Sequence, residues 1–236
     1  GTPSGTAEPT PPVYQLTIIG GFTDAFHFYP VIVRDSIATI YLHNNMLEYG
    51  HTYYVTIDNG VLNLADGSFQ GVTKEDEWTF TTKSDMPELS DTLIVDATGK
   101  GDFNTVQGAL DFIPDFNEQQ TVILVNPGDY EELVYTRNKW NVKIKGAGMA
   151  DTKVHYANNE VFNPHPLTVK TNEWPGTFPS RRAAFMLDNC KDIVIEDMTI
   201  ATDLKGQAEG LLINGERIAL YRVHIIGSGD ALQANG

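Results

Sequence analysis

The sequence reads NCKDIVI at residues 189–195 and NGERIAL at residues 214–220, so one pattern returns after 25 residues. The match continues further, because apolar residues at 198 and 200 return as apolar residues at 223 and 225. A period in the twenties, with short strands in each repeat, is typical of stacked coils. Each coil has an inward row of aliphatic side chains that only neighbouring coils can bury. The repeat therefore predicts an all-β fold, a right-handed parallel β-helix.

An earlier copy of the pattern is NVKI at residues 141–144, which lies 51 residues before the copy that starts at Asp192. We interpret this interval as about two periods that contain a longer, proline-bearing loop. Asparagine begins both later copies, so Asn189 over Asn214 predicts an asparagine ladder at a turn. A leucine-rich repeat is the alternative solenoid, but the leucine spacing of its consensus is missing from this sequence.

A short helix is predicted just after residue 104. Asn104 or Thr105 can cap it, because a side-chain oxygen at this position accepts a hydrogen bond from an unpaired backbone N–H. The apolar residues at 106, 109, 110 and 113 fall on one helical face, and Pro114 ends the helix.

The residues before the β-helix have a different pattern. Residues 1–12 are rich in proline, threonine and glycine and are predicted to be a disordered leader. Residues 13–83 contain short β-branched and aromatic runs between turn signals such as DNG at 58–60, which predicts a small β-sandwich. This stretch resembles bacterial Ig-like modules. Residues 84–91 then form a predicted linker, and residues 92–236 form the β-helix.

Composition excludes several classes of protein. The net charge of −15 and the pI near 4.6 argue against a nucleic-acid partner, since phosphates would be repelled. No apolar run reaches the roughly 18 residues of a membrane span. The single cysteine, Cys190, excludes an internal disulfide and a cysteine-based zinc site, and we expect it to be a buried, inert thiol. The six histidines show no ligand spacing, so neither a metal nor another cofactor is expected. The first residues lack the basic segment and apolar core of a signal peptide.

Five stretches in residues 92–236 resemble, in the same order, segments of the pectin methylesterase family. They are VDATGKGDFNTVQGAL at 95–110, NPGDYEE at 126–132, GAG at 146–148 with DTKV at 151–154, QAEGL at 207–211 and YRVHIIGSGDAL at 221–232. The second resembles the family's G-x-Y-x-E segment. The last two resemble its Q-A-V-A-L and F-Y-R-C-x-I-x-G-Y-Q-D-T-L motifs.

The resemblance implies an esterase that hydrolyses methyl esters of pectin, the methylated polygalacturonate. Such hydrolysis needs a nucleophile, a proton donor for methanol and hydrogen-bond donors for the oxyanion. By resemblance, Asp230 is the general acid/base and Gln207 is an oxyanion donor. Gln233 and Trp174 are candidate substrate-binding residues, and Trp140, Tyr156 and Phe178 join Trp174 as a candidate wall for sugar stacking. The resemblance also implies a secreted, periplasmic or cell-surface bacterial protein, and we expect a monomer.

Two departures from the family pattern limit this expectation. The glutamine of Y-Q-D, another oxyanion donor in the family, is Gly229 here, and Gln233 is the candidate replacement. The family's nucleophilic aspartate, and its substrate-orienting arginine and tryptophan, follow in later coils. We therefore expect the chain to be a fragment that is inactive by itself. Two alternatives are a non-catalytic module that binds or displays polysaccharide and, with less support, a polysaccharide lyase, for which no calcium-binding carboxylate cluster is evident.

Overall fold

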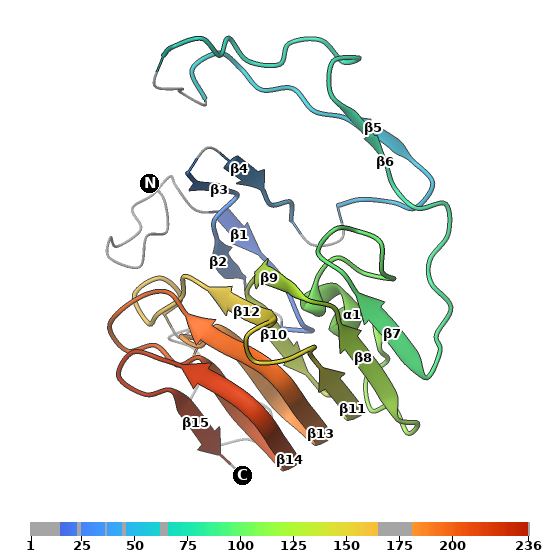
Figure 1. Cartoon of the computed structure of the whole chain (residues 1–236), viewed down its shortest axis with the longest axis vertical. Helices are drawn as coiled ribbons and strands as arrows, with labels where there is room; N and C mark the ends of the chain where they lie inside the picture. The colour runs from blue at the N-terminus through green and yellow to red at the C-terminus, as the bar shows by residue number, and fades with distance from the viewer. Residues whose placement is uncertain are drawn as a thin grey trace. The chain divides into compact units, whose positions relative to one another are not determined.

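The structure is a computed structural model that describes residues 15–22, 25–35, 37–43, 46–61, 66–164 and 181–235. Its elements, labelled in Figure 1, are β1 (Gln15–Thr17), β2 (Phe26–Phe28), β3 (Val31–Arg34), β4 (Ile37–Ile40), β5 (Thr52–Tyr54), β6 (Thr79–Thr81), β7 (Thr92–Val95), α1 (Val106–Phe112), β8 (Thr121–Val125), β9 (Gly128–Glu131), β10 (Val134–Arg137), β11 (Trp140–Lys145), β12 (Thr152–Tyr156), β13 (Phe185–Thr202), β14 (Leu211–Ile226) and β15 (Leu232–Asn235). In the part of the chain that is described, no helix has the length and apolar character needed to cross a membrane.

Strands of successive coils pair in parallel, which confirms the predicted β-helix (Figure 1). One face, the β15 face, consists of β10, the start of β13, the start of β14, and β15. The β7 face consists of β7, β8, β11 and the middle parts of β13 and β14. The β9 face consists of β9, β12 and the ends of β13 and β14.

Inward side chains stack in rows from coil to coil and form the core. The register of the β7 face aligns five aliphatic residues, and four of these are fully buried: Leu93, Ile123, Ile144 and Ile195, followed by the partly buried Leu220. Their alternation with outward residues is the period of two that a strand imposes. The predicted offset of 25 residues is confirmed, since Ile193 pairs with Ile218 and Ile200 with Ile225.

The structure corrects two details of the repeat. β11 pairs directly with β13, with Val142 opposite Ile193, so the interval of 51 residues is one coil with a long excursion rather than two periods. Asn189 does not stack over Asn214, because the register shifts between Asp188 and Cys190. Instead Asn189 donates to the Oδ1 of Asn138 at 2.8 Å.

Helix α1 begins and ends as the sequence predicted. Thr105 is its N-cap and accepts a hydrogen bond from the Gly108 N–H at 3.0 Å, and Ile113 is already extended before Pro114. The buried carboxylate of Glu132 accepts from the N–H groups of Val106 and Gln107, at 2.8 and 2.9 Å. The glutamate of the G-x-Y-x-E segment therefore satisfies backbone donors at the start of the helix.

The region from 13 to 83 is organised differently from the expected single sandwich. The described residues form three separate two-stranded antiparallel sheets, β1–β2, β3–β4 and β5–β6. Residues up to 44 belong to the same compact unit as residues 89–236, whereas residues 45–88 form a second unit. The physical reason is a set of apolar side chains that pack with residues of the β-helix in one buried cluster: Ile19, Phe22, Phe26, Tyr29 and Ile32. The Ig-like interpretation is not confirmed.

The second unit is held by local contacts. β5 pairs with β6, a β-bridge joins Ile57 to Val72, and the rings of Tyr53 and Phe80 stack with centroids 5.6 Å apart.

Candidate active site

The loops that hold Gln207 and Asp230 lie side by side. Gln207 follows β13, and Asp230 lies between β14 and β15. Ala208 and Ser228 exchange two backbone hydrogen bonds, at 3.0 and 2.7 Å, and the Gly206 N–H donates to the Ser228 hydroxyl at 3.1 Å. Both Gln207 and Asp230 are exposed to solvent. The stacking of coils thus brings an amide and a carboxyl, distant in sequence, to the same edge of the β-helix.

The backbone of Gly229 has a conformation that a glutamine would not readily adopt. Its φ is +92°, and a Cβ added there would lie 3.3 Å from the Gly206 carbonyl oxygen and 3.7 Å from the Gln207 Oε1. Side chains rarely tolerate this region of φ. The departure from Y-Q-D is therefore a change of loop conformation as well as the loss of an amide donor, and it leaves the Gln207 side chain beside the bare backbone of Gly229.

A buried ion pair lies next to these loops. The guanidinium of Arg182 contacts both carboxylate oxygens of Glu209, with Nε at 2.8 and 3.0 Å and Nη2 at 2.7 Å from Oε1. The Glu209 side chain is fully buried, and 24% of the Arg182 side chain is exposed. The hydrogen bond with Glu209, followed by the charges of Glu209, Glu160 and Asp230, raises the pKa of Arg182. Arg182 therefore stays positively charged, and its charge interacts with that of Asp230.

Gln233 belongs to the same polar cluster. It lies on β15, opposite Leu212 of β14, and its Oε1 accepts from Arg182 Nη2 at 3.4 Å. Because the oxygen of the amide faces Arg182, the N–H₂ group is left to donate elsewhere. Gln233 therefore has an amide donor that its contact with Arg182 does not use.

Sequence reasoning missed Arg182 and Glu209. Glu209 occupies the valine position of Q-A-V-A-L, and a charged residue in an apolar motif was the available signal. Its partner could not be identified from spacing, since Arg182 precedes β13 and lies one coil earlier.

The candidate aromatic wall is not supported where it is described. Trp140 lies on β11 and packs its ring against Phe116, whereas Tyr156 lies on β12 and is buried, with its hydroxyl accepting from the Tyr29 N–H. The two strands belong to different faces of the β-helix. Trp174 and Phe178 lie outside the described residues.

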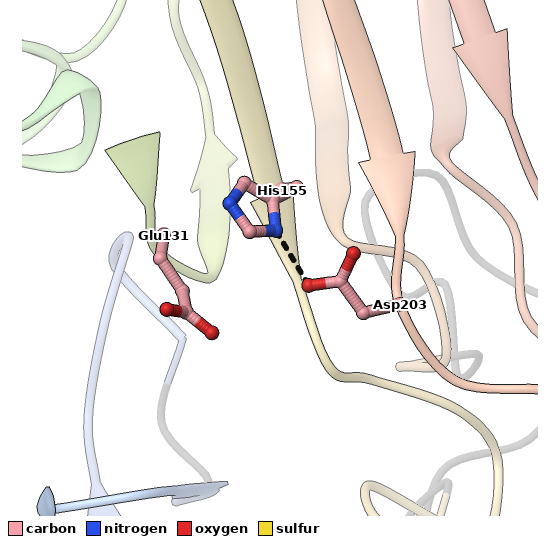
Figure 2. Close-up of side chains that lie close together, drawn as sticks. All are labelled: Glu131, His155 and Asp203. Atoms are coloured by element: carbon pink, nitrogen blue, oxygen red, sulfur yellow. Dashed lines mark hydrogen bonds and ion pairs between the residues drawn. The ribbon is translucent and has the colours of Figure 1, made fainter. Parts of the chain in front are cut away.

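A second charged cluster lies on the β9 face, where Glu131, His155 and Asp203 point toward one another from three segments (Figure 2). His155 is 5% exposed, and its Nδ1 lies 2.5 Å from an Asp203 oxygen. Burial raises the pKa of Asp203, but the hydrogen bond and the charge of His155 outweigh burial and lower it overall. Histidine spacing could not reveal this cluster, because its members come from separate coils.

The second cluster has the donor atoms of a metal site, all within 4.8 Å of one another. However, Arg34 of β3 contacts Glu131 at 2.5 Å and lies 3.9 Å from Asp203. A guanidinium at this position repels a metal cation and already pairs with the Glu131 carboxylate. We interpret the cluster as a charge network that joins β3 to the β9 face.

Comparison with known proteins places these observations in a family context. Residues 92–236 match the family model described as Pectinesterase. The chain is 30% identical over 147 residues to Pectinesterase QRT1 of Arabidopsis thaliana, covering 59% of this chain and 37% of that protein. It is 33% identical over 96 residues to Probable pectinesterase 67 of the same plant, and the match covers 38% of this chain and 28% of that protein.

Similar solved structures include the pectin methylesterase from carrot, with a TM-score of 0.48 and 22% identity over 63% of this chain and 44% of that chain. Pectin methylesterase PemA from Erwinia chrysanthemi has a TM-score of 0.47 and 20% identity, and the match covers 64% of this chain and 47% of that chain. The chain spans less than half the length of each of these four proteins.

Proposed function

The chain belongs to the pectinesterase family, and on that premise we propose that the protein hydrolyses methyl esters of polygalacturonate with Asp230 as general acid/base and Gln207 as oxyanion donor. The family membership supports a carbohydrate esterase that acts on pectin. The observation that supports these two residue roles is the paired backbone of Ala208 and Ser228, which holds their loops together at one edge of the β-helix.

The proposed chemistry proceeds in two balanced steps. A carboxylate attacks the ester carbonyl carbon, and the negative charge that develops on the carbonyl oxygen is stabilised by amide N–H donors, Gln207 and, in this proposal, Gln233. As the carbon–oxygen bond to the methoxy group breaks, Asp230 donates its proton to that oxygen and methanol leaves. Asp230 then takes a proton from water, which attacks the acyl intermediate and releases the free acid.

The nucleophile of this mechanism does not come from the pair next to the site. Glu209 is fully buried and bound by Arg182, so its oxygens are not available to attack. The residues that follow Asp230 in the printed sequence include no acidic residue. In our proposal the nucleophilic aspartate follows Gly236 in the full-length protein, and the printed chain alone does not release methanol.

The test measures methanol release from methyl-esterified pectin by the full-length protein. Asp230→Asn keeps the size of the side chain and removes the acid, so we expect a rate loss of roughly 10²-fold to 10⁴-fold. Gln207→Ala should cost about 10²-fold to 10³-fold. Asp192→Asn is the matched control, since Asp192 pairs with Arg217, whose side chain is 58% exposed. An unchanged rate in Asp230→Asn would remove Asp230 from the mechanism.

The substrate and the setting of the protein follow from the same proposal. We propose methyl-esterified pectin as the partner, an extracellular location and a monomeric state. The alternative, a non-catalytic polysaccharide-binding module, predicts that the full-length protein binds pectin and releases no methanol above the buffer rate.

A further inference from the structure

The outward side chains of the β15 face form a row that leads to the candidate active site. Strand register aligns Tyr135, Met186, Leu212 and Gln233 on successive coils. They point outward, because their neighbours in sequence, such as Phe185 and Leu211, belong to the interior core. Successive strands lie roughly 4.8 Å apart. The row therefore runs along the axis of the coils and ends, in the described residues, at Gln233.

Most of this row is buried, and it is in contact with another part of the chain at Tyr135. Tyr135, Met186 and Leu212 are 0% exposed although they face away from the interior. They belong to a second hydrophobic cluster that also contains Ile19, Phe22, Phe26, Tyr29 and Ile32. We call residues 19–22 and 25–34 the covering segment. By contrast, Gln233 is only half-buried and Asp230 is exposed.

Aromatic and cationic contacts dock the covering segment on the face. The ring of Phe26 lies 4.5 Å from that of Tyr135, and Phe22 lies 5.9 Å from the same ring. Arg137 lies over Phe22 at 4.0 Å, and Arg181 over Phe26 at 4.3 Å. Such contacts between a cation and the face of an aromatic ring are attractive.

Polar contacts anchor the same segment further along. The His27 N–H donates to Asn163 Oδ1 at 2.7 Å, and Asn163 Nδ2 donates back to the His27 carbonyl oxygen at 3.1 Å. The ring of Tyr29 stacks on Phe162 at 4.5 Å. Arg34 adds the ion pair with Glu131. The segment is thus attached from end to end, from the β15 face to the β9 face.

At one point the backbone of the covering segment touches the β-helix itself. Gly20 has φ +62°, and a Cβ added there would lie 1.7 Å from the carbonyl oxygen of Tyr135. Any side chain larger than hydrogen is therefore excluded while the segment is docked. The neighbouring Gly21 has φ +77° but meets only the flexible side chain of Arg137, at 3.4 Å.

We propose that the covering segment closes the side of the candidate active site that faces the earlier coils, so that the site accepts chain ends and short oligomers of methyl-esterified galacturonate. This rests on the proposed function. A long chain that presents an interior sugar to Asp230 and Gln233 must continue on both sides of it. Along the row of the β15 face, Leu212 is already covered on the coil before Gln233, so that direction is blocked about one strand spacing from the site.

The experiment compares two substrates of equal methyl content, long polygalacturonate and short oligomers, with the full-length protein. Methanol release gives kcat/KM per ester, and mass spectrometry locates the esters removed first. We expect faster release from oligomers and removal that starts at one chain end. Gly20→Ala should raise the ratio of kcat/KM on polymer to that on oligomer about tenfold, whereas the matched Gly21→Ala should leave it within about twofold.

Hydrogen exchange monitors docking in both variants. In Gly20→Ala we expect faster exchange in the covering segment and unchanged protection of β13 and β14. If β13 also loses protection in Gly20→Ala, the variant Phe26→Ala is tested in its place. This substitution removes the ring contact with Tyr135 and introduces no backbone clash. Esters removed evenly along the polymer by the wild type, or an unchanged ratio in an undocked variant, overturn the inference and leave the esterase proposal intact. No methanol from either substrate overturns the proposed function itself.

Discussion

The ion pair between Arg182 and Glu209 provides the sharpest test of how the candidate site is built. Arg182→Leu removes the guanidinium that pairs with the fully buried carboxylate of Glu209. Breaking such a pair on one side leaves an uncompensated buried charge, which costs about 3–5 kcal/mol of unfolding free energy. Because a domain is stable by only about 5–15 kcal/mol, this loss should be large and easy to measure.

The double variant Arg182→Leu with Glu209→Val separates the pair from the packing around it. Valine is the residue of the family motif at position 209, and replacing both charges with apolar groups is commonly neutral to within about 2 kcal/mol. We therefore expect the double variant to recover most of the stability lost in Arg182→Leu. The two single variants and the double variant form a cycle whose coupling energy should exceed about 2 kcal/mol.

Urea unfolding of the 236-residue chain measures these changes as shifts in midpoint at constant slope. Arg217→Leu is the control, since the Arg217 side chain is 58% exposed in its pair with Asp192 and should leave the midpoint unchanged. Equal effects of Arg182→Leu and Arg217→Leu, or no recovery in the double variant, would refute the reasoning.

Three further predictions concern the β-helix. Burial raises the pKa of Glu132 to about 7, above its ordinary value of 4.5, so the folded chain binds its proton more tightly. The contribution of Glu132 to the free energy of unfolding is therefore complete below pH 4.5 and is lost as pH rises through 7. In Glu132→Gln, urea titrations across this pH range should show a smaller decline in the free energy of unfolding. Thr105→Ala should lower the free energy of unfolding by about 1 kcal/mol. Thr105→Ser should lower it much less, since serine keeps the oxygen that accepts from the Gly108 N–H. Equal losses of the two variants in thermal or urea unfolding would argue against the cap. The Cys190 thiol is 1% exposed and burial raises its pKa to about 12, so a thiol reagent should label it only as the chain unfolds, and rapid labelling of the native chain would contradict its burial.

The repeat and the helix were predictable because both depend on local periodicity. Ile193 and Ile218 align at the predicted offset, and Thr105 caps the helix, since a strand period of two and a capping oxygen are properties of a few adjacent residues. The ladder at Asn189 was predicted with the wrong partner, because a single extra residue shifts the register and periodicity alone does not reveal a bulge.

The sequence by itself determined that coils stack in residues 92–236 and, through Q-A-E-G-L and G-S-G-D-A-L, which loops hold Gln207 and Asp230. Only the tertiary structure decided that Arg182 neutralises Glu209 and that residues 19–22 and 25–34 pack on the β-helix. The physical reason is that inward positions repeat along the chain and can be recognised locally. The partner of a buried charge, or the surface that an apolar segment covers, depends on which coils meet in space.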